Sequence, residues 1–395
     1  METYENHEYK LLQGITDLYG GVDMRDVLLL SCQHLLGPQL RMFELFLRAG
    51  LKPENCIIAG KNYSTNHGVR KDLERLGCVV APWSEGFEAQ VAFDDWFARR
   101  LDEFLTVELM MRDMRSIRMI IVLDDGGHMH EAAVKFFGRD PRLAGVEQTS
   151  SGYNRIMTTG IAFENEHMVA RTPYKQFEEA PYIGICGMSR ILAHLRARGK
   201  TDPNILVLGL GTIGRQIAGR LFVLEKKRGV AADIHFDDDD HKNIRLRDFG
   251  ANHLLVADGR IIGHADAMAR LSEFDVIIGA TGYPSIPEGD LDRLHPEVSL
   301  ISMSSSDREF PALRFRKPGD LVHSDCYNGK RCLVNAGFPI TFSGVRHEVR
   351  PIEIELTMAQ LYACVLDLAG KGKVANLPNL SLALAQAHDI WQAEC

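Results

Sequence analysis

The sequence predicts an α/β protein with two domains, each built around a parallel sheet. Two observations lead to this fold class. The chain has 395 residues, which exceeds the usual size of a domain with one hydrophobic core. Short apolar segments alternate with segments of helical periodicity in both halves of the chain. This alternation is typical of parallel sheets whose faces are covered by helices.

The first half of the chain supplies the first predicted sheet. Its strand candidates are short runs dominated by apolar residues, as expected of buried parallel strands. In chain order we expect a strand at Val27–Ser31, a helix at Gln39–Arg48, a strand at Cys56–Ala59, a helix at Gly68–Leu76, a strand at Cys78–Ala81, an amphipathic helix within Val91–Met114 and a strand at Met119–Leu123.

The second half repeats the pattern and supplies the second predicted sheet. It opens with a five-residue apolar strand that runs directly into a glycine-rich turn and a helix. The expected elements are a strand at Ile205–Gly209, a helix at Gly214–Glu225 and strands at Ile234–Phe236, His253–Val256, Val276–Ile278 and Leu300–Ser302.

Two segments mark where one domain gives way to the other. Arg171–Gly187 is rich in Pro, Gly and Glu, and we interpret it as a first hinge. After about Ser343 the periodicity becomes helical again, over Ile352–Leu368, as if the chain returned to the first domain. We therefore expect residues 1–186 and 344–395 to form one domain, with residues 187–343 inserted in it as the other.

The composition is that of an ordinary globular protein whose partners are small molecules. The formal net charge of -8 attracts neither nucleic acid nor an anionic membrane. No apolar run approaches the roughly 20 residues that span a bilayer, and the polar start, Met1–Lys10, is unlike a signal peptide, so a cytoplasmic protein is expected. The eight cysteines form no Cys-x-x-Cys pair, which favours reduced thiols over a disulfide framework or a zinc site.

A glycine-rich turn follows the strand that opens the second half. Gly209-x-Gly211-x-x-Gly214 stands between a strand and a helix, with Thr212 and Ile213 inside the motif. The first glycine permits a tight turn, the second lets the backbone approach a pyrophosphate, and the third lets the helix pack on the strand. Helix N–H groups then face the phosphates. The motif in this context predicts a Rossmann-type domain that binds a nicotinamide dinucleotide.

The residues after the next strand favour NAD over NADP. Asp237 is placed to accept hydrogen bonds from the adenosine ribose, and its charge repels a 2′-phosphate, although His241, Lys242 and Arg245 weaken that preference. Further along, the small loop containing Thr281 and Gly282 follows a strand and fits over a nicotinamide ribose. The alternative is a glycine turn in an α/β fold that binds no ligand.

Several short motifs occur in the same order as in one enzyme family. They are Ser31-Cys32-Gln33-His34, Asn62-Tyr63-Ser64-Thr65, Leu123-Asp124-Asp125-Gly126-Gly127, Gly145-Val146-Glu147-Gln148-Thr149-Ser150-Ser151-Gly152, Asn328-Gly329-Lys330-Arg331 with Leu333-Val334-Asn335-Ala336-Gly337, and Ile354-Glu355-Leu356. On these motifs the chain resembles S-adenosylhomocysteine hydrolase (adenosylhomocysteinase) across most of its length.

The resemblance implies a substrate domain formed by both ends of the chain around a central NAD domain. It also implies a reaction cycle in which NAD oxidises a nucleoside hydroxyl, a thiol is eliminated, water adds and the hydride returns. His34 and Asp125 match catalytic positions of the substrate domain. The residues that match NAD contacts are Thr149, Ser150, Ser151 and Asn335. A homo-oligomer, dimer or tetramer, is implied as well.

The chain departs from the family pattern at several catalytic positions. Gln148 replaces a ribose-contacting glutamate, and a neutral amide cannot act as a base. Aligned on the shared phenylalanine, the catalytic lysine of the family falls on Tyr174, so Lys175, one residue on, becomes the candidate. Glu178 and Glu179 belong to the same segment. The loop that gates the family's site reads Ser304-Ser305-Ser306-Asp307 here and has no histidine.

Three functions stay open on the sequence alone. The first is an adenosylhomocysteinase-like enzyme acting on a nucleoside thioether or related substrate by reversible hydroxyl oxidation, with His34, Asp125, Gln148, Lys175, Glu178 and Glu179 as the catalytic candidates. The second is a net NAD-dependent oxidoreductase that acts on a different hydroxylated metabolite. The third is a non-catalytic NAD-binding relative.

A metal site is considered and not expected. Asp124-Asp125-x-x-His128-x-His130-Glu131 is dense in metal-ligand types. Consecutive residues that leave a strand rarely converge on one ion, and a turn capped by an aspartate explains the same segment.

Overall fold

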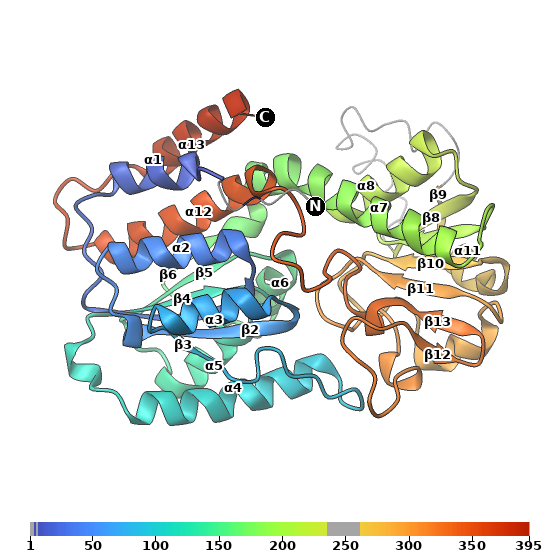
Figure 1. The fold of residues 1–395 in the computed structure, drawn as a ribbon, viewed down its shortest axis with the longest axis horizontal. Coiled ribbons are helices and arrows are strands. Elements are labelled where there is room, and N and C mark those ends of the chain that lie inside the picture. The colour runs from blue at the N-terminus through green and yellow to red at the C-terminus, as the bar shows by residue number, and fades with distance from the viewer. Residues whose placement is uncertain (1–3, 5–6, 235–260, 395) are drawn as a thin grey trace. The chain divides into compact units, whose positions relative to one another are not determined.

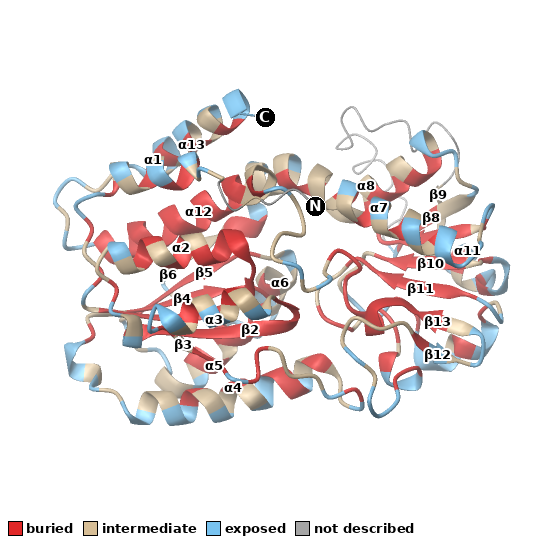
Figure 2. Ribbon diagram, in the orientation of Figure 1, coloured by how far each residue is buried: buried red, intermediate tan, exposed pale blue. Residues whose placement is uncertain are grey.

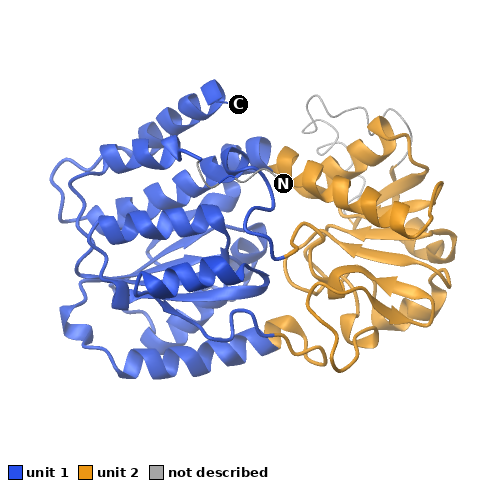
Figure 3. Cartoon of the chain, viewed as in Figure 1, with its two compact units in different colours: residues 1–86, 96–179, 344–395 blue, residues 87–95, 180–343 orange. Residues whose placement is uncertain are grey.

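The computed structural model describes residues 4, 7–234 and 261–394. The chain divides into two compact units (Figure 3). Unit 1 comprises residues 1–86, 96–179 and 344–395, and unit 2 comprises residues 87–95 and 180–343. The sequence analysis placed residues 87–95 and 180–186 in the first domain, whereas in the structure they belong to unit 2.

Unit 1 is built on a six-stranded parallel sheet with the strand order β3-β2-β1-β4-β5-β6. The strands are β1 (Val27–Leu35), β2 (Cys56–Thr65), β3 (Val79–Val80), β4 (Met119–Asp124), β5 (Leu143–Glu147) and β6 (Asn165–Met168). The first strand is central and the order reverses between β1 and β4. Ligands of open parallel sheets bind where strand order reverses, beyond the carboxyl ends of the strands.

Helices cover both faces of the unit 1 sheet (Figure 1). They are α1 (Lys10–Leu18), α2 (Gly37–Arg48), α3 (His67–Arg75), α4 (Phe93–Met110), α5 (His128–Phe137), α6 (Ser150–Thr159), α12 (Pro351–Gly370) and α13 (Leu380–Glu394). Helix α12 contacts α2, β4 and β5, so the chain after residue 343 does return to unit 1. Its residues 355–370 are all buried, because the helix is covered by α1, α2 and α13 as well as by the sheet (Figure 2).

Unit 2 carries a seven-stranded mixed sheet with the order β12-β13-β11-β10-β7-β8-β9. Its strands are β7 (Ile205–Leu208), β8 (Gly229–Asp233), β9 (Ile261–Gly263), β10 (Val276–Gly279), β11 (Ser299–Ser302), β12 (Cys326–Asn328) and β13 (Arg331–Leu333). The pairs are parallel except for β12 with β13, which is antiparallel. The first strand again lies centrally and the order reverses between β7 and β10, which is the Rossmann arrangement.

Three helices of unit 2 lie among its described residues. They are α7 (Ala180–Ala197), α8 (Thr212–Gly219), which continues as a π-helical turn (Arg220–Leu224), and α11 (His264–Ala269). The hydrophobic core joins α7 and α8 to β7, β10 and β11 through side chains such as Ile191, Ile217 and Ile278. Within the described part of the chain, no helix is both long enough and apolar enough to cross a membrane.

The α/β fold class is confirmed, and three local expectations need correction. The strand after α8 was expected at Ile234–Phe236, but β8 ends earlier, at Asp233. The segment Arg171–Gly187, interpreted as a hinge, does contain the boundary between the two units, after Glu179, but residues 174–179 form a π-helical turn that runs directly into α7. The strands β5, β6, β9, β12 and β13 were not expected, because each is interrupted by glycine or polar residues or spans only three residues. Asp237 and the strand expected at His253–Val256 lie outside the described residues.

Candidate functional site

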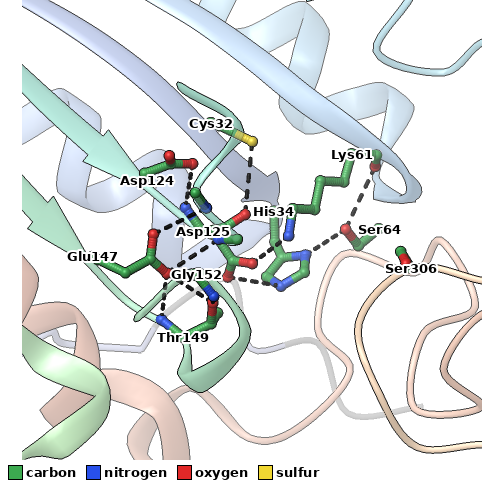
Figure 4. A network of polar contacts seen from close by, with 12 residues as sticks. Cys32, His34, Lys61, Ser64, Asp124, Asp125, Glu147, Thr149, Gly152 and Ser306 are labelled. Atoms are coloured by element: carbon green, nitrogen blue, oxygen red, sulfur yellow. Dashed lines mark hydrogen bonds and ion pairs between the residues drawn. The ribbon is translucent and has the colours of Figure 1, made fainter. Parts of the chain in front are cut away.

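The carboxyl ends of β1, β2 and β4 bring three ionisable side chains together in unit 1 (Figure 4). The Lys61 ammonium donates to Oδ1 of Asp125, and Nε2 of His34 lies 3.2 Å from the other oxygen of that carboxylate. On its far side, Nδ1 of His34 lies 2.5 Å from Oγ of Ser64. His34 and Asp125 were predicted as catalytic, and the structure brings them together at the position where the strand order reverses; their catalytic role stays a prediction.

Lys61 was missed by the sequence analysis. It occupies the sixth position of β2, next to the Asn62–Thr65 motif that the resemblance picked out, and is only 1% exposed. A lysine is almost never fully buried unless it is paired. The available signal was a lysine two residues after the apolar run Cys56–Ala59, where the strand was expected to end, although β2 continues to Thr65.

Burial and ion pairing have opposite effects on the pKa values of Asp125 and Lys61 in this network. Burial by itself raises the pKa of Asp125, but the Lys61 ammonium and the His34 ring outweigh it and hold that pKa well below its usual range. Burial likewise disfavours charged Lys61, and the Asp125 carboxylate reverses this, so the pKa of Lys61 is raised. The pair is therefore ionised at neutral pH, with the His34 ring against the Asp125 carboxylate.

The turn after β4 is held by a second buried carboxylate. Oε1 of Glu147 accepts hydrogen bonds from Gly126 N at 3.1 Å and Thr149 N at 2.6 Å, and Oε2 accepts one from Gly127 N at 3.2 Å. A side chain at position 152 would come closer than 3.0 Å to the same carboxyl group, so glycine is required there. Burial and the nearby Asp124 carboxylate raise the pKa of Glu147 to about 8. Glu147 thus fixes the turn that presents Asp125.

His130 lies behind this turn and faces a carboxylate on each side. Its Nδ1 is 2.9 Å from Asp124 Oδ2 and its Nε2 is 3.2 Å from Glu166 Oε1. Burial alone would lower the pKa of His130, but the hydrogen bonds to Asp124 and Glu166 raise it to about 10. The ring is an imidazolium at neutral pH.

The charged His130 predicts how stability depends on pH. The unfolded histidine loses its proton near pH 6.5, whereas the folded one keeps it to about pH 10. Between these values the native state keeps the His130 proton, and up to about pH 8 it also keeps the Glu147 proton that the unfolded chain has already released. The free energy of unfolding should therefore fall as pH rises from 6.5 to 10, with His130 alone responsible above about pH 8. Chemical denaturation across this range measures the slope. His130→Gln should flatten it, and an unchanged slope in that variant would contradict the assignment.

The remaining predicted residues near β5 have different surroundings. Gln148 is buried and its Oε1 has no hydrogen-bond partner in the described structure, so a polar group of a ligand could satisfy it. Thr149 caps α6 by accepting from Gly152 N at 3.0 Å, which occupies its hydroxyl. Ser150 and Ser151 form the first turn of that helix.

Lys175, Glu178 and Glu179 do not join the network around Asp125 in the described contacts. Nζ of Lys175 donates to Glu179 at 2.6 Å, and Glu179 accepts from Thr357 of α12. Glu178 lies 3.4 Å from His388 of α13. The aromatic ring of Tyr174 stands against that same His388. These residues attach the π-helical turn to the two C-terminal helices.

The glycine turn of unit 2 has the geometry that its sequence predicts. Gly209 has φ +90°, and a Cβ there would lie 2.7 Å from the Ala280 carbonyl oxygen. A Cβ on Gly214 would come closer than 3.0 Å to the Gly209 carbonyl oxygen, whereas a Cβ on Gly211 would meet no atom within 4 Å. The first and third glycines are required by the fold, and the second opens onto free space. Helix α8 starts directly after it, at Thr212 and Ile213.

Asp233, which the sequence analysis passed over, supports this turn. It is the last residue of β8, and its Oδ2 accepts a hydrogen bond of 2.7 Å from Leu210 N. An acidic residue therefore does end the second strand, four positions before Asp237, the residue expected there.

A buried glutamate organises the loop after β10. Oε1 of Glu309 accepts from the backbone N–H groups of Thr281 and Gly282, both at 2.7 Å, and Oε2 accepts from Thr281 Oγ1 at 3.0 Å. The hydroxyls of Ser285 and Ser304 donate to the same carboxylate. Thr281 and Gly282 therefore lie at the carboxyl edge beside Gly209, while their polar groups are turned toward Glu309.

Asn335 and Ser306 are both in the left-handed region, with φ of 54° and 62°. The Asn335 amide donates to the carbonyls of Pro339 at 2.9 Å and Phe342 at 3.1 Å, and its oxygen faces His323 at 3.2 Å. In this conformation the Asn335 side chain holds the loop that contains it in place. The structure leaves the NAD contact predicted for Asn335 as a prediction.

Two groups of metal-ligand side chains occur among the described residues. In the first, Asp124, His130 and Glu147 lie together in the core of unit 1. Backbone N–H groups and the His130 ring already occupy both carboxylates of this group. The second is formed by His194, Asp325 and Cys332 in unit 2. The sequence analysis considered a metal site in the segment that contains Asp124 and His130 and did not expect one, and it did not consider the second group.

Comparison with known proteins places the chain near sequences that are themselves uncharacterized. No family model matches. The chain is 30% identical over 348 residues to the uncharacterized proteins Rv0104 and MT0113 from two strains of Mycobacterium tuberculosis, and the match covers 86% of this chain. It spans 64% of the length of each relative.

Solved structures give only a distant likeness. A dipicolinate synthase from Bacillus halodurans shares 14% identity at a TM-score of 0.35, over 71% of this chain and 81% of its own. Formate dehydrogenase from Granulicella shares 13% at 0.32, over 63% and 64% of the two chains. Scores this low support no inference about activity, and the resemblance to adenosylhomocysteinase stays a prediction.

Proposed function

We propose that the protein is an NAD-dependent enzyme that acts on a small hydroxylated substrate. The observation that carries the proposal is the glycine turn of unit 2. Gly209 and Gly214 permit the close strand–helix approach, and the open face of Gly211 exposes backbone amides at the start of α8. This arrangement suits the pyrophosphate of a dinucleotide. Asp237, outside the described residues, is our candidate for selecting NAD over NADP.

Unit 1 supplies the acid–base groups that hydroxyl oxidation requires. Removing a hydride from a carbinol carbon leaves a proton on the hydroxyl oxygen, which a nearby base must accept. His34 is suited to this task because Asp125 orients its ring and stabilises the charged imidazolium. Lys61 keeps Asp125 ionised, so the acceptor pair is preserved at neutral pH.

A bound nicotinamide would supply the hydride acceptor, and the chain's own residues decide the fate of the oxidised substrate. The resemblance favours a closed cycle, in which the hydride returns after elimination of a thiol from a nucleoside thioether. Gln148 carries no charge, and Lys175 is paired with Glu179. Two charged groups of the family's catalytic pattern are therefore absent from this site. Their absence favours the second candidate, net oxidation of a different hydroxylated metabolite. Absorbance of NADH during turnover separates the two, because only net oxidation accumulates NADH.

Dinucleotide binding can be tested directly at Gly211. A valine there meets no protein atom near its Cβ but projects into the space proposed for the pyrophosphate. Losing one or two charge-assisted hydrogen bonds of about 1.5–3 kcal/mol each should weaken NAD binding about 100-fold. Equilibrium dialysis with NAD and NADP measures this.

The matched control is Gly289→Ala, since position 289 is equally open and belongs to a different loop. It should bind NAD like the wild type. Failure of the wild-type protein to retain either coenzyme, oxidised or reduced, would refute the proposal.

A further inference from the structure

A set of metal-ligand atoms lies in unit 2 away from the glycine turn. Nδ1 of His194, a carboxylate oxygen of Asp325 and Sγ of Cys332 all lie within 4.8 Å of one another. His194 belongs to the last turn of α7, Asp325 immediately precedes β12, and Cys332 is the middle residue of β13. The sequence separates these residues by up to 138 positions, so only the fold brings them together.

The separation of the ligand atoms fits an ion better than a hydrogen bond. His194 Nδ1 and Asp325 Oδ2 are 3.6 Å apart, and this is longer than the 2.7–3.2 Å of a typical hydrogen bond. Two such atoms bound to one tetrahedral zinc, each about 2.0–2.2 Å from it, lie about 3.4 Å from each other. The observed distance of 3.6 Å is therefore close to that between two ligands of one zinc ion, so these two side chains would have to move little to bind it.

Neighbouring groups orient the ligands in the way that protein metal sites require. Nε2 of His194 lies 3.1 Å from Ser299 Oγ, so Nδ1 is the ring nitrogen that faces the group. Asp325 Oδ1 accepts from Asn335 N at 3.2 Å, which leaves Oδ2 turned toward His194. Such outer contacts fix the orientation of metal-binding histidines and carboxylates.

We propose that His194, Asp325 and Cys332 form a zinc site, with water as the fourth ligand. One histidine, one carboxylate and one thiolate carry two negative charges, which match a divalent ion, and the nitrogen, oxygen and sulfur set suits zinc. Ser299 is the first residue of β11, whereas the glycine turn follows the last residue of β7, so the site lies toward the opposite ends of the strands. A bound ion would tie α7 to the β12–β13 hairpin, while the water position stays open to exchange.

The inference is independent of the proposed enzyme function and can be tested with Zn²⁺ and Co²⁺ alone. The full-length protein, stripped with a chelator and titrated with Co²⁺, should develop a thiolate-to-cobalt charge-transfer band at one equivalent. Zn²⁺ should displace that band and raise the melting temperature, because it binds the native state. Absence of the band in the wild-type protein would overturn the inference.

Variants identify the ligands. Cys332→Ser should lose the band, and Asp325→Asn should retain it with at least tenfold weaker binding. The matched control is Cys326→Ser, because Cys326 is a buried thiol on the paired strand and does not belong to the ligand set. A band that survives Cys332→Ser, or that disappears in Cys326→Ser, would also reject the site.

Discussion

Replacing Lys61 with methionine should lower the free energy of unfolding by about 3–5 kcal/mol at pH 7. Methionine keeps much of the volume of the side chain, but it leaves the Asp125 carboxylate buried with only His34 beside it. Breaking a buried ion pair costs this much because one charge stays desolvated and uncompensated. Urea denaturation of the variant and of the wild-type protein measures the difference.

The size of this loss should depend on pH in a defined direction. In the wild-type protein the pKa of Asp125 is held low, so the pair stabilises the fold above the unfolded aspartate pKa of about 4 and stops doing so as pH falls. The Lys61→Met defect should therefore shrink in acid. Adding Asp125→Asn to Lys61→Met should recover much of the stability at pH 7.

The matched control for Lys61 is Lys135, which forms an ion pair with Asp102 at the surface. Because water screens an exposed pair, Lys135→Met should cost less than about 1 kcal/mol. Equal losses in the two variants would mean that burial of the Lys61 pair has no energetic consequence, contrary to the expected cost of a desolvated carboxylate.

Replacing Gly214 with alanine should destabilise the protein by about 3 kcal/mol. Alanine inside a helix is normally favoured over glycine by roughly 1 kcal/mol, so propensity alone predicts the opposite sign. The added Cβ, however, would come closer than 3.0 Å to the Gly209 carbonyl oxygen. That atom belongs to a tight turn and cannot rotate away, so α8 must move off β7 and lose packing. Thermal and denaturant unfolding measure the loss.

Gly211→Ala provides the comparison within the same turn. A Cβ at position 211 meets nothing within 4 Å, and its backbone is extended, so the unfolding free energy should change by less than about 1 kcal/mol. If the two alanine variants were equally stable, the close contact between Gly214 and the turn would be refuted.

The sequence was most informative where local sterics leave few choices. The glycines at 209 and 214 have to be glycines because backbone atoms occupy the space of any side chain, and that requirement is visible in the motif itself. The apolar strand candidates were located for the same reason, since a strand buried on both faces tolerates few polar residues. The shorter and more polar β5 and β6 carry no such signature and were missed.

The sequence pattern located the end of β4 to within one residue but ended β1 four residues early, at Ser31 instead of Leu35, and His34 and Asp125 were named through the resemblance. It did not show that Lys61 completes their network, because the three residues are up to 91 positions apart and meet only through the strand order β2-β1-β4. Spacing around Lys175 and Glu179 gave no hint that these side chains turn toward α12.

By itself, then, the sequence determined the α/β class and the glycine turn, because each is encoded in short stretches with a strong steric or apolar signature, and the resemblance pointed to His34 and Asp125 separately. The tertiary structure alone decided the buried Lys61 ion pair, the placement of Asp233 and the grouping of His194, Asp325 and Cys332. These depend on which distant strands become neighbours. That choice is made by the packing of whole elements and not by any local pattern.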